Sequence, residues 1–233
     1  MTPAQPDVAL TAAVRTALTA AADPALAPGM QAYMKSDLPY FGVRLPETRR
    51  LTKACVVAHP PTDRQIWEAT VRELYDRATH REERYAALVL AGHPTARAWQ
   101  DLAVLPLHRH LVTTGAWWDL VDWVATRLVG PVHRSMRSDV EPVVLGWARD
   151  DDLWLRRTAV LCQVGAKDAL DLNLLSACLE PNLERPEFWL RKACGWALRD
   201  ASYRHPAWVR AYVSAHEERL AGLTRREATK HLG

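Results

Sequence analysis

Two side chains that could stabilise a positive charge stand four residues apart within a predicted helix over 116–129. They are Trp118 and Asp122, and residues at this spacing share one helix face. An aromatic face attracts cations and a carboxylate stabilises a developing positive charge. The helix has an apolar stripe that would dock it without them, made of Trp117, Val121, Val124 and Leu128. The alternative is that Trp118 is another core ring and Asp122 a solvated charge, which is the commoner situation for a single helix.

Two later predicted helices carry further candidates. Arg157 interrupts an otherwise apolar helix side, so it needs an anionic partner or open water. It could clamp a phosphate or form a salt bridge to a neighbouring helix. Trp196 follows Lys192 by four residues and is either a second aromatic wall or a ring packed under the lysine stem. Arg157 follows Trp118 by 39 residues and precedes Trp196 by 39, a spacing that would set the three side by side in stacked repeats.

The elements that must position these residues are helices throughout, because sustained alternation and hairpin turns are missing from the sequence. We expect N-caps at Asp63, Ser138 and Thr224, and first-turn prolines at Pro46 and Pro206. The predicted helices are 7–22, 27–36, 46–58, 63–77, 80–92, 95–103, 106–113, 116–129, 138–149, 152–164, 168–179, 187–202, 206–219 and 224–232.

An internal echo indicates how the helices are arranged. The segment Asp152–Ala159 is similar to Glu187–Cys194, at an offset of 35 residues. Each has an acidic start, apolar residues and a basic pair, as in the inner helices of HEAT-type repeats, although HEAT periods are longer, about 40–47 residues. We therefore predict an all-α, HEAT-like solenoid of stacked antiparallel helical hairpins, curved around a concave groove. With no linker in sight, residues 1–233 are predicted to form one domain.

Bulk properties limit the classes of function. The net charge of +3 and pI near 8.7 permit nucleic-acid binding without requiring it. The four cysteines lack zinc-ligand spacing, so no metal site is expected, and they suit small core residues in a reducing compartment. Met1 to Leu10 lacks a secretory pattern and no apolar run reaches transmembrane length, so we expect a cytoplasmic protein.

Several motifs in order resemble the AlkD-type DNA alkylation-repair glycosylases, which have a HEAT-like fold. The resemblance covers most of the chain. It rests on Tyr33-Met34-Lys35, Phe41-Gly42-Val43, Pro46-Glu47-Thr48-Arg49-Arg50, Trp117-Trp118-Asp119-Leu120-Val121-Asp122, Trp154-Leu155-Arg156-Arg157-Thr158-Ala159, Gly195-Trp196-Ala197-Leu198-Arg199, Leu223-Thr224-Arg225-Arg226-Glu227-Ala228 and Lys230-His231. Arg156 departs modestly from the family's motif, because it adds a positive charge beside Arg157. It follows Asp152 by four residues and can pair with it.

The resemblance implies a role for each matching position. Trp118 and Trp196 would be aromatic walls against the deoxyribose of the lesion, and Asp122 the catalytic carboxylate. Arg157 would hold a phosphate, and Tyr33 would face the DNA. Three basic residues that could also contact DNA are Lys35, Arg191 and Lys192.

The resemblance also implies a substrate. Family members excise positively charged bases such as 7-methylguanine and 3-methyladenine from duplex DNA, and can do so without flipping the base. We therefore expect a monomeric, nucleoid-associated, monofunctional glycosylase that acts on alkylated purines in double-stranded DNA, with no cofactor.

Two other interpretations remain open. The chain could be a non-catalytic HEAT-repeat protein that binds distorted DNA, or a scaffold for protein partners. Asp122 is the residue that distinguishes an enzyme from these alternatives, because a carboxylate near phosphates contributes nothing to DNA binding.

Overall fold

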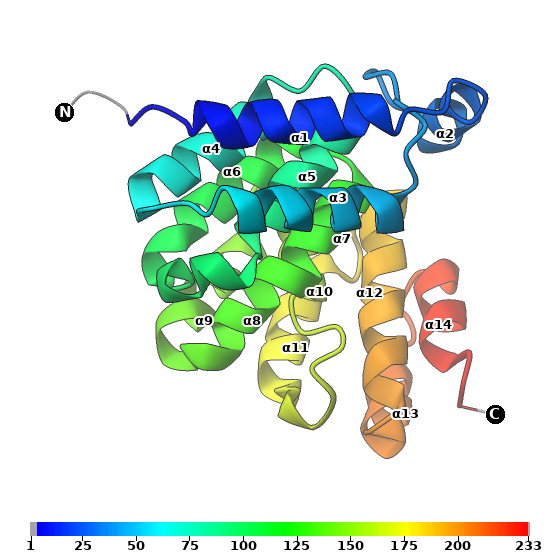
Figure 1. Ribbon diagram of the computed structural model, residues 1–233. Coiled ribbons are helices and arrows are strands. Elements are labelled where there is room, and N and C mark those ends of the chain that lie inside the picture. Colours follow the sequence, from blue (N-terminus) through cyan, green and yellow to red (C-terminus); the bar gives the residue numbers. More distant parts are fainter. Residues whose placement is uncertain (1–3, 233) are drawn as a thin grey trace. The chain divides into compact units, whose positions relative to one another are not determined.

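The computed structural model describes residues 4–232, and all of its regular elements are helices (Figure 1). This confirms the predicted all-α class for the described part of the chain. Contacts divide the chain into two compact units, with the boundary between Gln100 and Asp101, and the single domain stays a prediction. Met1–Pro3 and Gly233 lie outside the described residues. The prediction that Met1 to Leu10 lacks a secretory pattern therefore falls partly outside them.

The first unit is built around one buried helix. Its elements are α1 (Val8–Ala20), α2 (Ala27–Met34), α3 (Leu45–Ala58), α4 (Arg64–Asp76), α5 (Arg81–Ala91) and the 3-10 helix η1 (Pro94–Trp99). Every residue of α5 except Arg84 is buried. A helix that is buried on all sides must lie at the centre of its unit. Accordingly α5 packs against α3 and α4, and α1 contacts all three.

The second unit holds all the candidate residues from Trp118 onwards. Its elements are η2 (Leu102–Val104), α6 (Leu105–Gly115), α7 (Trp118–Trp123), η3 (Val124–Val129), α8 (Gly130–Ser135), α9 (Arg137–Trp147), α10 (Leu153–Leu161), η4 (Lys167–Ala169), α11 (Leu172–Leu179), η5 (Glu180–Asn182), α12 (Phe188–Ser202), α13 (Pro206–Ala215) and α14 (Gly222–Thr229). Helix α10 is central and contacts α6, α7, α9, α11 and α12. Helix α14 packs along α12 (Figure 1).

The predicted helix over 116–129 needs correction. The α-helix α7 begins at Trp118 and gives way at Val124 to a π-helix, η3, which continues into α8. We expected the helix to end before Gly130, but the helical backbone continues through Gly130 and Pro131 into α8. The apolar stripe is confirmed for Val121, Val124 and Leu128, which are buried. Trp117 instead precedes α7 as its N-cap residue and is half-buried.

The predicted helix over 95–103 is wrong, because the chain there forms the two short 3-10 helices η1 and η2. The ring of His93 caps η1 and accepts from the N–H of Thr95 at 3.3 Å. The carboxylate of Asp101 caps η2 and accepts from the N–H of Ala103 at 3.0 Å. Each side-chain cap begins a new turn, which divides the segment.

The predicted caps are right in one case and wrong in two. The carboxylate of Asp63 accepts from the N–H of Ile66 at 2.9 Å, as expected of an N-cap. Ser138 lies inside α9 and Thr224 inside α14, so neither caps its helix. The hydroxyl of Thr224 instead donates to the carbonyl of Arg191 at 3.1 Å, which ties α14 to α12. A tertiary partner therefore decides the role of this threonine.

The two predicted first-turn prolines are confirmed, since Pro46 and Pro206 lie in the first turns of α3 and α13. The cysteines are free thiols, and all but Cys55 are buried. Burial raises the pKa of Cys162 and Cys194 to about 12, so these two thiols are unreactive near neutral pH. Within residues 4–232, no helix is long and apolar enough to cross a membrane.

Candidate active site

The centre of the candidate site is an ion pair between α7 and α10. Arg157 donates from Nε to Oδ1 of Asp122 at 2.7 Å and from Nη2 to Oδ2 at 2.8 Å. The Arg157 side chain is 3% exposed, while that of Asp122 is 15% exposed. A two-fold contact of this kind fixes the plane and direction of the carboxylate. Asp122 is therefore the more exposed partner of a largely buried pair.

The third nitrogen group of Arg157 is also occupied. Its Nη1 donates to the backbone carbonyl of Trp189, at the start of α12. The interhelical salt bridge that we considered for Arg157 is thus present, with Asp122 as the carboxylate. A phosphate contact by Arg157 stays a prediction. These contacts use three of its five N–H groups, and the side chain is only 3% exposed.

The ring that lies beside Trp118 is Trp189, which we had not selected as a site residue. Their centroids are 6.4 Å apart and their planes differ by 19°. The guanidinium carbon of Arg157 lies 5.9 Å from the centroid of the Trp189 ring. Trp189 therefore contacts both the predicted aromatic wall and the residue that holds the carboxylate.

Further aromatic rings surround Trp189. The centroid of Trp117 lies 5.4 Å away, that of Trp154 6.3 Å away and that of Phe188 5.0 Å away. Trp117 and Trp154 are themselves 6.1 Å apart. Together with Trp118 and Trp189 these rings form what we call the aromatic cluster: Trp117, Trp118, Trp154, Phe188 and Trp189. Phe188 is 56% exposed and the four tryptophans are half-buried, so the cluster lies at the surface of the second unit.

The protonation of Asp122 is set by two opposing effects. Burial raises the pKa of Asp122 above its ordinary value of 3.8, because an ionised carboxylate is poorly solvated there. The hydrogen bonds and charge of Arg157 lower the pKa, and the nearby charge of Asp119 raises it slightly. Arg157 thus helps to keep a mostly buried carboxylate ionised.

The remaining predicted residues of α12 lie further along the helix. Trp196 is half-buried, and among residues 4–232 no aromatic ring lies against it. Its pairing with Trp118 as a second wall stays a prediction. Lys192 pairs with Glu227 of α14 at 2.6 Å, and Arg191 donates from Nε to the carbonyl of Arg185 at 2.9 Å.

The expected pairing of Arg156 with Asp152 needs correction. The carboxylate of Asp152 caps α10 and accepts from the N–H of Trp154 at 2.7 Å. Arg156 instead donates to the side chain of Asn182 at 3.1 Å and to several backbone carbonyls. A helix N-terminus offers unpaired N–H groups to a carboxylate, and Asp152 meets that need.

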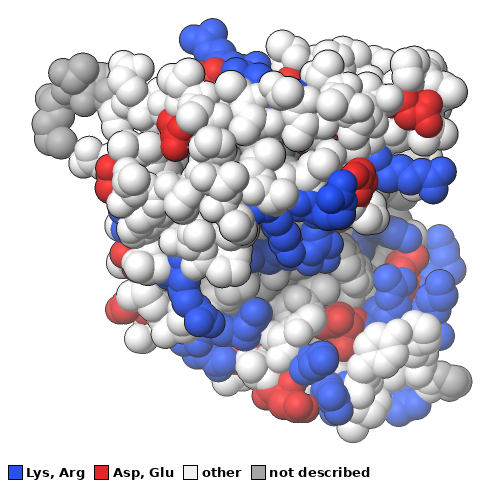
Figure 2. All heavy atoms as spheres, viewed as in Figure 1, with Lys and Arg blue, Asp and Glu red and all other residues white. Residues whose placement is uncertain are grey.

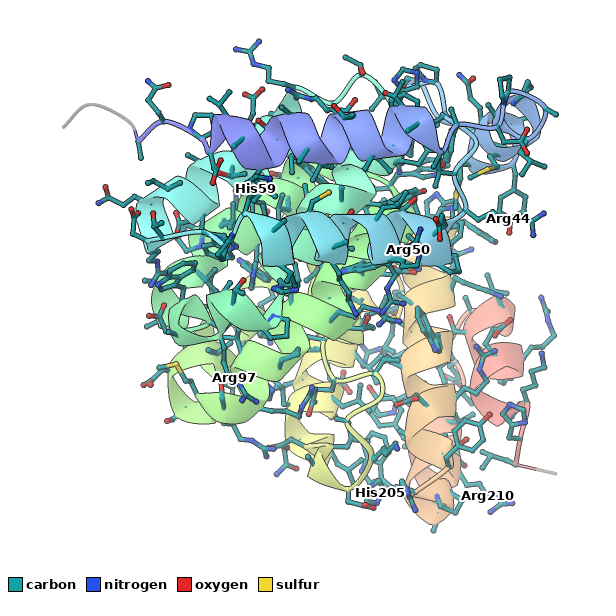
Figure 3. All side chains as sticks on the ribbon, viewed as in Figure 1. Arg44, Arg50, His59, Arg97, His205 and Arg210 are labelled. Atoms are coloured by element: carbon teal, nitrogen blue, oxygen red, sulfur yellow. The ribbon has the colours of Figure 1, made fainter. Side chains whose placement is uncertain are left out.

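Tyr33 and Lys35 belong to the first unit. Tyr33 is 76% exposed near the end of α2, and Lys35 follows in a left-handed conformation with φ of 49°. Figure 3 shows Arg44 and Arg50 at the N-terminal end of α3, where Arg50 pairs with Glu47 at 2.6 Å. These exposed side chains suit surface contacts.

Basic side chains also gather in the second unit. Figure 2 shows Lys and Arg over α14, the helix that carries Arg225 and Arg226 and is followed by Lys230. Arg225 is paired with Glu217 at 2.9 Å. A surface of this kind can contact phosphates without sequence preference.

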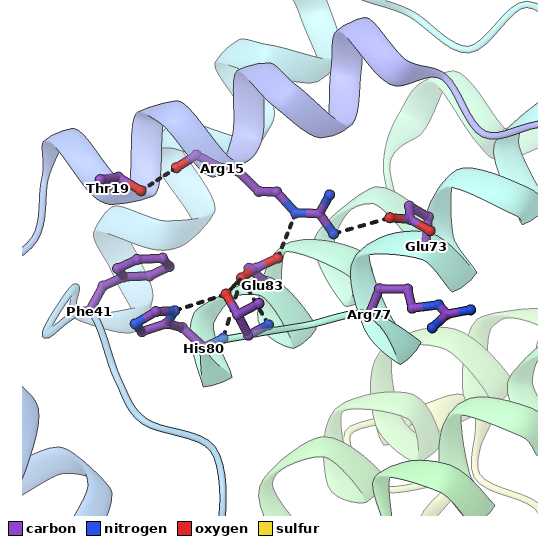
Figure 4. Close-up of a pocket in the computed structure, with 8 residues that line it drawn as sticks. Arg15, Thr19, Phe41, Glu73, Arg77, His80 and Glu83 are labelled. Carbon is purple, nitrogen blue, oxygen red and sulfur yellow. Dashed lines mark hydrogen bonds and ion pairs between the residues drawn. The ribbon is translucent and has the colours of Figure 1, made fainter.

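The first unit contains a cleft of about 550 Å³ (Figure 4). Its charged groups largely satisfy one another, because Arg15 donates to Glu83 at 2.8 Å and to Glu73 at 3.3 Å. The Phe41 and His80 rings stack at one end, with centroids 3.7 Å apart. Within the described residues, no group of three or more metal-ligating side chains is found.

Comparisons with known proteins show the family to which the chain belongs. A family model described as "DNA alkylation repair enzyme" matches residues 14–232. The chain belongs to the DNA alkylation repair enzyme family. DNA is therefore its expected partner, and the suspected family is confirmed. A search of the curated proteins found no match.

Solved structures show the same fold. A predicted DNA alkylation repair enzyme from Enterococcus faecalis is 27% identical, with a TM-score of 0.81, over 91% of this chain and 97% of that one. AlkD2 from Streptococcus mutans is 16% identical, with a TM-score of 0.64, over 88% and 98%. The smu.31 protein of Streptococcus mutans UA159 is 17% identical, with a TM-score of 0.62, over 81% and 93%. These likenesses confirm the AlkD-like helical repeat fold.

The sequence contained a sign of the role of Trp189 that we did not use. Trp154 and Trp189 occupy equivalent places in the echo at an offset of 35 residues. The pair of Asp122 and Arg157 is separated by the same 35 residues. We had relied on the 39-residue spacing that joins Trp118, Arg157 and Trp196, whereas the contacts between Asp122 and Arg157 and between Trp154 and Trp189 follow the shorter offset.

Proposed function

We propose that this family member is a monofunctional DNA glycosylase for positively charged alkylated purines, such as 7-methylguanine and 3-methyladenine, in duplex DNA. The observation that carries the proposal is the carboxylate of Asp122, which is oriented by Arg157, is partly open to solvent and shares a helix face with Trp118. A carboxylate that meets a substrate must be reachable from solvent, and the Asp122 side chain is 15% exposed.

The proposed reaction breaks the bond between C1′ of the deoxyribose and the alkylated base. The electron pair of that bond moves to the base, which leaves neutral because it began with a positive charge. The sugar becomes oxocarbenium-like, and the negative charge of Asp122 stabilises it. Water then adds to C1′, and Asp122 accepts its proton. The product is an abasic site in an unbroken strand, because no lysine is assigned as a nucleophile.

The aromatic and basic residues would hold the DNA. Trp118 and Trp196 would flank the deoxyribose, and no base flipping is required if the glycosidic bond is reached from the backbone side. Contacts to phosphates are proposed for Tyr33, Lys35, Arg157, Arg191 and Lys192. Binding should therefore weaken as salt concentration rises. We propose that the protein acts as a monomer at the nucleoid.

The decisive experiment incubates the protein with duplex DNA that contains one 7-methylguanine and measures the free base. Asp122→Asn should reduce the single-turnover rate by about 10²-fold or more, since it removes the charge that stabilises the transition state. DNA affinity should stay the same or improve. Asp139→Asn, an exposed position on α9, is the matched control and should keep the wild-type rate.

Two outcomes would reject the proposal. Wild-type protein that binds the duplex but releases no base would favour a non-catalytic DNA-binding protein. Equal base release by wild type and Asp122→Asn would remove Asp122 from the mechanism.

A further inference from the structure

Trp189 contacts both halves of the candidate site. Its ring lies nearly parallel to that of Trp118, at 6.4 Å and 19°. Its backbone carbonyl accepts from Arg157, whose guanidinium carbon lies 5.9 Å from the same ring. Trp189 thus connects α12 to α7, which carries Trp118 and Asp122, and to α10, which carries Arg157.

The surroundings of Trp189 leave its ring little freedom. Trp117, Trp154 and Phe188 border it at centroid distances of 5.4, 6.3 and 5.0 Å. Trp189 is half-buried, so these ring contacts, rather than complete burial, restrict the orientation of its indole. A fixed ring can in turn restrict the groups that rest against it.

We propose that Trp189 is a positioning residue, whose indole holds the Trp118 ring and the Arg157 guanidinium in the arrangement that orients Asp122. This inference rests on the proposed function for its catalytic consequence. Trp189 acts through its neighbours rather than on the substrate. Shortening the side chain would leave a void between α7, α10 and α12, into which Trp118 and Arg157 could move.

The test compares Trp189→Leu with the conservative Trp189→Phe, using single-turnover release of 7-methylguanine from a duplex. Trp189→Leu should slow base release by about tenfold, because misplaced reacting groups slow the chemical step. DNA affinity should change by less than about threefold. Trp189→Phe retains an aromatic ring and should stay within about threefold of wild type.

A second measurement does not depend on activity. The pKa of the Asp122 carboxyl can be followed by ¹³C NMR of the DNA-free protein. The charged groups that act on the Asp122 carboxyl are Arg157 from α10 and Asp119 from its own helix. From α12, the carbonyl and the ring of Trp189 contact Arg157. Loosening Arg157 removes the contact that lowers this pKa, so Trp189→Leu should raise it, and the acid limb of the rate profile should move to higher pH.

Trp154→Leu is the matched control. Trp154 belongs to the aromatic cluster and is half-buried like Trp189, but its ring contacts are with Trp117 and Trp189. It should change the rate and the Asp122 pKa less than Trp189→Leu does. Folded Trp189→Leu protein with a wild-type rate and Asp122 pKa would overturn the inference. If the wild type releases no base, the proposed function fails, and the carboxyl titration alone decides whether Trp189 positions the pair.

Discussion

Breaking the pair between Arg157 and Asp122 should be costly for folding. Arg157→Met keeps a long apolar side chain but removes every guanidinium contact, including the two at 2.7 and 2.8 Å. It leaves Asp122 with 15% exposure and without its cation. Loss of one partner of a buried pair costs about 3–5 kcal/mol. Because the Asp122 side chain is 15% exposed, we expect about 3 kcal/mol, the lower end of that range.

A double-mutant cycle in urea measures this coupling. The free energies of unfolding of Arg157→Met, Asp122→Leu and the double variant are compared with wild type at equal m-values. The double variant should recover most of the loss and lie within about 1 kcal/mol of wild type, because it buries no unpaired charge. The deficit of Arg157→Met should also shrink as pH falls, since protonation neutralises Asp122.

Either of two results would refute this reasoning. A loss below about 1 kcal/mol in Arg157→Met would show that the pair behaves like an exposed one. A double variant as unstable as the single one would show that packing of the arginine stem, rather than an unpaired carboxylate, causes the loss.

Two further predictions concern the scaffold. A Cβ at Gly195 would lie 2.5 Å from Cβ of Glu227, so Gly195→Ala should push α14 from α12 and cost about 1–3 kcal/mol in urea unfolding. The control is Gly146→Ala on α9, where an added Cβ meets nothing within 4 Å, so it should be neutral or stabilising by up to about 1 kcal/mol. Equal losses of stability in the two variants would contradict the close approach of α14 to α12 at Gly195. His108 is fully buried with its pKa lowered to about 3, so it stays neutral when folded, while the unfolded chain binds a proton below its ordinary pKa of 6.5. Its contribution to stability should therefore be lost as pH falls below 6.5, by about 1.4 kcal/mol per pH unit. Urea unfolding at pH 7.5 and 5.5 should show that the free energy of unfolding decreases less in His108→Leu than in the wild type.

Local physics made much of the fold readable from the sequence. Apolar spacing identified most helices, and the short side chain of Asp63 marked a true N-cap because its partner N–H lies three residues away. The stripe through Val121 and Val124 predicted which side of α7 and η3 is buried. The proximity of Trp118 and Asp122 along one helix likewise follows from helical periodicity alone.

What the sequence could not decide depends on contacts between distant residues. Arg157 had two possible partners, a phosphate or a carboxylate, and only the packing of α10 against α7 brought it to Asp122. The ring beside Trp118 proved to be Trp189, because the order in which helices stack determines which side chains meet. The change to a π-helix after Trp123 was equally hidden, since backbone hydrogen bonding there adapts to packing. Periodicity fixes which residues share a face, whereas the partner across the interface is chosen by the whole tertiary structure.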